Sequence, residues 1–123
     1  MKQEENFFTA FSRLLSERLA KITMDQNRKL DASTCRSIFV TIYEVVHQIS
    51  KEGELYLSNE GLNYVAQQFY DGLLINGNQE LDPNIFDKRA KLENISSKDL
   101  VSVLALFGGT DFRFDVIQEL KGR

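Results

Sequence analysis

The residues most able to do chemistry near neutral pH are one cysteine and one histidine, Cys35 and His47. Both fall in a segment with helical periodicity, and the intervening helix would separate them by about 18 Å. A nucleophile and its base must be within hydrogen-bond reach, so these two side chains cannot act as a pair. We therefore expect a core role for Cys35, a partly buried or interfacial role for His47, and no enzymatic activity.

Metal and cofactor chemistry has little support in the pattern of residues. A zinc site needs several Cys and His side chains, and the chain has one of each. The segment from Asp25 begins like a calcium loop, but Leu30 stands where glycine is needed and Arg36 where the bidentate acid should be. Three acids spaced four apart are interpreted as a solvated helix face: Asp111, Asp115 and Glu119. We predict no cofactor and no metal.

Length and composition are those of a globular domain. The 123 residues are 42% hydrophobic and 27% charged, with one proline, so we expect a single domain over residues 1–123. A lone cysteine and an N-terminus without a secretory pattern favour a cytoplasmic location. No apolar run approaches the roughly 20 residues needed to span a bilayer, so a membrane is not an expected partner.

Charge is unevenly distributed along the chain. Between Arg13 and Arg36 there are six basic and three acidic residues, and after Arg36 there are eight basic and thirteen acidic ones. Such asymmetry can steer a partner or set two subunits head to tail. Nucleic-acid binding through the basic region is the alternative function, and its candidate contacts are Arg13, Arg18, Lys21, Arg28, Lys29 and Arg36.

Apolar residues recur every three or four positions through most of the chain, which predicts helices. The expected ranges are 5–28, 32–51, 59–75, 83–92, 97–107 and 111–121. The fold class is therefore all-α: a compact bundle of five or six helices with short loops and mixed crossing angles. The last two helices imitate a helix-turn-helix in which Phe114 would be a packing position, although the acids of the second helix would repel DNA.

Several helix ends carry recognisable signals. Three starts combine an N-cap residue with an apolar pair that would pack across it: Leu57-Ser58 with Leu62, Leu81-Asp82 with Phe86, and Ile95-Ser96 with Leu100. Gly53 is predicted to terminate the helix over 32–51 as a C-terminal glycine cap. Gly72 lies inside the helix over 59–75, where it indicates a close helix crossing or an early helix end.

The helix over 32–51 has a complete core-facing stripe and, beside Arg36, a second apolar line formed by Val40, Tyr43 and His47. A second apolar face indicates either a central position in the core or contact with a partner, and both readings stay open. The residues left over after one core face is assigned to each helix are the candidate protein interface: Val40, Tyr43, His47, Tyr64, Tyr70 and Leu74. The leading hypothesis is a non-catalytic protein-interaction module (assembly subunit, adaptor, chaperone or small inhibitor) that binds a protein partner or forms a homo-oligomer.

Overall fold

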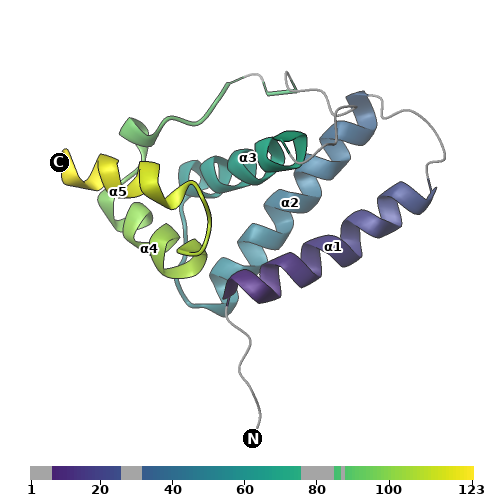
Figure 1. Ribbon diagram of the computed structural model, residues 1–123, viewed down its shortest axis with the longest axis horizontal. Helices are drawn as coiled ribbons and strands as arrows, with labels where there is room; N and C mark the ends of the chain where they lie inside the picture. Colours follow the sequence, from purple (N-terminus) through teal and green to yellow (C-terminus); the bar gives the residue numbers. More distant parts are fainter. Residues whose placement is uncertain (1–6, 26–31, 76–84, 87) are drawn as a thin grey trace, which may run out of the picture.

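The computed structural model describes residues 7–25, 32–75, 85–86 and 88–123 (Figure 1). Five α-helices and one 3-10 turn, with no strand, form within these ranges, which confirms the all-α prediction. They are α1 (Phe7–Asp25), α2 (Ala32–Glu52), α3 (Asn59–Ile75), the turn η1 (Leu92–Asn94), α4 (Ser97–Phe107) and α5 (Arg113–Lys121).

Helix α2 is central to the arrangement of the longer helices. Both α1 and α3 pack along it, α4 lies across one end against α1 and α3, and α5 packs on α4 (Figure 1). An aromatic cluster joins these helices where they meet. The Phe11 ring stacks on Phe69 at 4.1 Å between centroids and meets Phe107 edge-on at 5.5 Å. Phe69 also contacts Phe112 at 5.4 Å, so one cluster ties α1, α3, α4 and the start of α5 together.

The predicted core stripe of α2 is buried as its periodicity requires. Cys35 is fully buried, in keeping with the structural role expected for it. The other buried apolar residues of the stripe are Ile38, Ile42, Val45, Val46 and Ile49. Buried Ser50 continues the stripe at the C-terminal end of α2. Its hydroxyl donates to the carbonyl of Leu55 and accepts from the N–H of Leu57. This side chain fixes the connection from α2 to α3.

Two of the three predicted helix starts are described by the structure, and both are confirmed. Ser58 Oγ accepts the N–H of Gly61 at 3.3 Å, and Ser96 Oγ accepts the N–H of Asp99 at 3.1 Å. The flanking apolar residues of both starts are buried: Leu57, Leu62, Ile95 and Leu100. The third start, Leu81-Asp82, lies outside the described residues.

The buried carboxylate of Asp99 links the starts of two helices. It accepts hydrogen bonds from the backbone N–H of Ser58, at 3.2 Å to Oδ2, and from the hydroxyl of Ser58. A capping-box acid would satisfy the start of its own helix, whereas this one caps α3 from the first turn of α4. Gly61 leaves room for it, since a Cβ at that position would stand 2.9 Å from Asp99 Oδ2.

Two local predictions are wrong. The helix over 83–92 is not formed at residues 85, 86 and 88–91, where the chain is non-helical. Gly72 meets no helix at close range among the described residues, because a Cβ there would find none of their atoms within 4 Å, and α3 continues past it to Ile75. The predicted end of α2 is confirmed, since the helix ends at Glu52 directly before Gly53; Glu54, the next residue, is left-handed (φ 58°).

Candidate functional site

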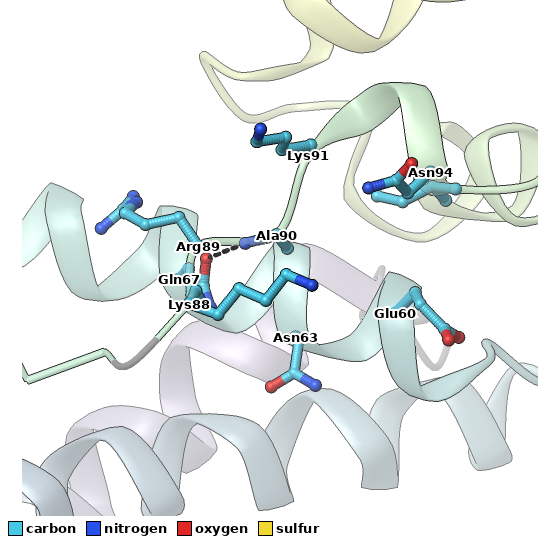
Figure 2. Close-up of a pocket in the computed structure, with 9 residues that line it drawn as sticks. Glu60, Asn63, Gln67, Lys88, Arg89, Ala90, Lys91 and Asn94 are labelled. Atoms are coloured by element: carbon cyan, nitrogen blue, oxygen red, sulfur yellow. Dashed lines mark hydrogen bonds between the residues drawn. The ribbon is translucent and has the colours of Figure 1, made fainter.

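Residues 88–91 are non-helical, with Lys91 in the extended backbone conformation, and one buried side chain of α3 holds them in place; we call these residues the extended segment. The amide of Gln67, only 4% exposed, donates to the carbonyl of Lys88 at 3.3 Å and accepts the N–H of Ala90 at 2.8 Å (Figure 2). The Gln67 amide thereby pairs with this backbone as the peptide group of a neighbouring strand would in a β-sheet. A helix over these residues would use the same backbone groups internally, so this pairing explains why the predicted helix is absent.

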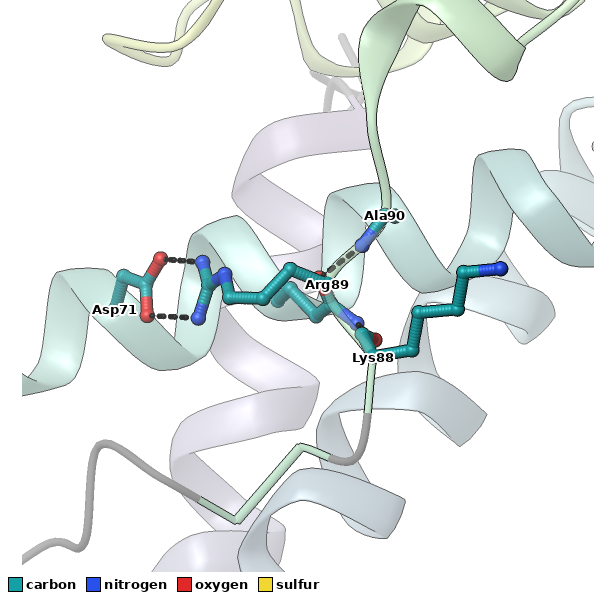
Figure 3. Close-up of polar contacts among 5 residues, drawn as sticks. Asp71, Lys88, Arg89 and Ala90 are labelled. Carbon is teal, nitrogen blue, oxygen red and sulfur yellow. Dashed lines mark hydrogen bonds and ion pairs between the residues drawn. The ribbon is translucent and has the colours of Figure 1, made fainter.

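Side chains of the extended segment lie on both sides of that contact. Arg89 points toward the C-terminal end of α3, where its guanidinium makes a two-point ion pair with Asp71 and lies 5.1 Å from the Phe86 ring centroid. Lys88 points the other way along α3, toward its N-terminal end (Figure 3). The backbone contact to Gln67 and the ion pair to Asp71 together fix the segment on α3.

Two adjoining hollows lie beside this segment. The first has a volume of about 420 Å³ and a mainly polar lining (Figure 2), which includes Glu60, Lys88, Lys91 and Asn94. The second, of about 430 Å³, lies toward α2. Its wall is formed by the apolar residues Phe39, Val40, Ile85 and Phe86 together with Arg36. Asn63, Gln67 and Lys88 line both hollows, so the hollows are direct neighbours, and we refer to them together as the α2–α3 groove.

The charges along the α2–α3 groove are predominantly positive. Arg36, Lys88 and Lys91 are exposed there, none of them has an ion-pair partner among the described residues, and the one acid among the described lining residues is Glu60. Arg89 also borders the groove, but its charge is matched by Asp71. A groove with an aromatic and aliphatic wall, side-chain amides and unmatched cations suits an apolar side chain flanked by carboxylates.

Three of the predicted interface residues lie on one face of α2. Val40 is 51% exposed and lines the groove, and His47 is exposed farther along the helix. Tyr43, between them, is half-buried, and its hydroxyl lies 3.4 Å from Asn59 Oδ1. The side chain of Leu74 lies outside the described residues. Within the described structure, the second apolar line of α2 is therefore a surface feature that borders α3.

The two predicted interface tyrosines of α3 are core residues instead. Tyr70 is fully buried and meets Phe86 edge-on at 5.3 Å between centroids. Tyr64 is 3% exposed and packs edge-on against Phe112 at 6.0 Å. Burial raises the pKa of Tyr64 to about 12, with a further contribution from the charge of Asp115. Neither side chain can contact a partner in this conformation, because Phe86 covers Tyr70 and Phe112, at the start of α5, covers Tyr64.

The candidate nucleic-acid contacts have different surroundings. Arg13 lies 3.8 Å from Glu17 on the exposed side of α1, and Lys21 is exposed on the same helix. Arg18 instead donates to Gln48 Oε1 of α2 at 2.8 Å. Arg36 lines the α2–α3 groove, as described above, and Arg28 and Lys29 lie outside the described residues. The described candidates therefore differ in their contacts: Arg13 is beside an acid, Arg18 binds α2, and Arg36 lines the groove.

Sequence reasoning missed the residues that build the groove on the α3 side. Asn63, Gln67, Lys88 and Lys91 are polar residues of ordinary types, and no local motif marks them. The one usable signal is spacing: Glu60, Asn63 and Gln67 recur at helical intervals and so share a face of α3.

Within the described part of the chain, no group of three or more His, Cys, Asp or Glu side chains is arranged to hold a metal ion. None of the described helices combines the length and apolar character needed to cross a bilayer. No protein-family model, curated protein or solved structure matches the chain.

Proposed function

We propose that this protein is a non-catalytic protein-interaction module and that the α2–α3 groove is its binding site. The observation that carries the proposal is that the two hollows lie side by side and share three lining residues. An exposed apolar position, Val40, lies in the same groove as the unmatched cations Arg36, Lys88 and Lys91. Apolar anchoring at the centre of a polar, charged rim is the usual composition of a protein interface.

Rigidity of the groove walls supports the same function. One wall is α2, whose opposite face is embedded in the core, and the other is the extended segment held by Gln67 and Asp71. A site whose walls are already ordered loses little conformational entropy when a partner docks. The groove is therefore suited to receive a segment of another protein without rearrangement.

Site-specific photo-crosslinking in the native host tests the proposal. A photoreactive phenylalanine analogue placed at Val40 should crosslink to a discrete protein partner. The matched control is the same analogue at Val101 of α4, which is similarly exposed (57% against 51%) but does not line the groove. Equal protein crosslinking from both positions, or none from Val40, would refute the groove as a binding site. Crosslinks to nucleic acid from Lys21 instead would favour the alternative function.

A further inference from the structure

The described surface contains a second exposed feature, and it lies on α5. Phe114 is 58% exposed at the start of that helix, although a large aromatic side chain is usually buried. Exposed Asp111 and Asp115 flank it, three residues before and one residue after. The guanidinium of Arg113 lies 4.4 Å from the ring centroid and covers one face of the ring. We call Asp111, Phe114 and Asp115 the α5 face.

The α5 face has the chemistry that the α2–α3 groove lacks. It presents one large apolar side chain between two carboxylates, with the Arg113 guanidinium on one face of the ring, whereas the groove presents an apolar wall beside cations without an ion-pair partner among the described residues. Phe114 is of a size to pack against Phe39 and Val40, and the two acids would then approach the basic rim. Attraction between such surfaces orients the approach, and burial of the ring supplies most of the binding free energy.

Both surfaces belong to every copy of this chain. No residue of α5 lines either hollow, so the two surfaces occupy different parts of the molecule. We infer that the α2–α3 groove of one copy binds the α5 face of a second copy, head to tail; this assignment rests on the proposed function of the groove. Such a contact is heterologous, since each bound copy still has one unused surface. The assembly must therefore grow into a closed ring or an open chain.

A mixing experiment distinguishes this arrangement from any symmetric contact. Val40→Glu blocks the groove, and Phe114→Glu blocks the α5 face. By sedimentation, the wild-type protein should form species that grow with concentration, whereas each variant alone should be monomeric. Each substitution should raise the dissociation constant at least about thirtyfold, as expected for an interface hot spot. An equimolar mixture of the variants should form a 1:1 dimer that grows no further, because one intact groove meets one intact face.

Controls separate assembly from folding. Both blocking positions are exposed, so the variants should retain the wild-type circular dichroism spectrum and melting temperature. Val101→Glu should assemble as the wild type does, because that position lies on neither surface. Raising the salt concentration should weaken wild-type assembly, since oppositely charged groups face each other across the contact.

Three results would each overturn the inference. The wild-type chain could be monomeric at every accessible concentration, or the Phe114→Glu variant could assemble normally. The third is a mixture of the two variants that stays monomeric while the wild type assembles. Failure here is distinguishable from failure of the proposed function. If the photoreactive residue at Val40 captures a different protein while the purified chain is monomeric, the groove is a binding site for that protein. The self-assembly assignment alone is then refuted.

Discussion

Gln67 is the residue on which the shape of the candidate site depends most directly. Its buried amide makes two hydrogen bonds to the backbone of the extended segment, one to Lys88 and one from Ala90. Each such bond contributes about 0.5–1.5 kcal/mol net, so Gln67→Ala should weaken docking of the segment on α3 by about 1–3 kcal/mol. Since alanine is at least as good a helix former as glutamine, α3 itself should not be weakened.

Amide hydrogen exchange at Ala90 measures this docking directly. In the wild type its N–H is covered by the Gln67 side chain, and exchange requires the segment to leave α3. A weakening of about 1–3 kcal/mol should lower the protection of this amide about five- to 150-fold. Amides of α2 facing the core should keep their protection, because the change is confined to the groove wall.

Gln68→Ala is the matched control, since it makes the same chemical change on the next residue of α3, where the side chain is half-buried. It should leave the protection of Ala90 unchanged. Equal protection of Ala90 in Gln67→Ala and the wild type would refute the account given for the extended segment. Equal loss in both variants would show that the effect comes from α3 as a whole and not from the amide contact.

Other predictions concern the interior. Asp99→Ala should lower the free energy of unfolding by about 2–3 kcal/mol in chemical denaturation, because it removes a buried, charged acceptor of the Ser58 N–H and hydroxyl. Gly72→Ala should raise it by about 1 kcal/mol, since no atom of the described residues would lie within 4 Å of the new Cβ. The same change at Gly61 should lower it, because the new Cβ would stand 2.9 Å from Asp99 Oδ2; stabilisation there would contradict the close approach. For Tyr64 the folded-state pKa, about 12, exceeds the unfolded value near 10, so this residue's contribution is complete below pH 10 and is lost as pH rises from about 10 to 12. The free energy of unfolding of Tyr64→Phe should fall less over that range than that of the wild type.

Local signals predicted much of the fold because their causes are local. The caps at Ser58 and Ser96 depend on a hydroxyl meeting a backbone N–H three residues later, which the sequence shows directly. The buried stripe of α2 follows from helical spacing alone. The second cap at the start of α3 is different. There Asp99 accepts the N–H of Ser58, 41 positions away in the sequence, and no local pattern predicts such a contact.

The candidate site was only partly predictable for the same reason. The exposure of Val40 is predictable from the sequence, because this residue lies beside the core stripe of α2 and not on it. Tyr70 falls outside the core face that helical spacing assigns to α3, but it is covered by Phe86, which lies beyond the end of that helix. Phe114, which would pack between the last two helices in the helix-turn-helix that they imitate, is exposed. Burial at such positions depends on tertiary contacts, which periodicity does not encode.

The absence of the predicted helix and the shape of the groove both involve Gln67. Its side-chain amide pairs with backbone groups of Lys88 and Ala90, which a helix would have paired internally. Phe86 packs edge-on against Tyr70 and also lines the apolar hollow. A variant that restored helix at residues 88–91 should therefore lose the Gln67 contact, and with it the groove wall that this contact holds.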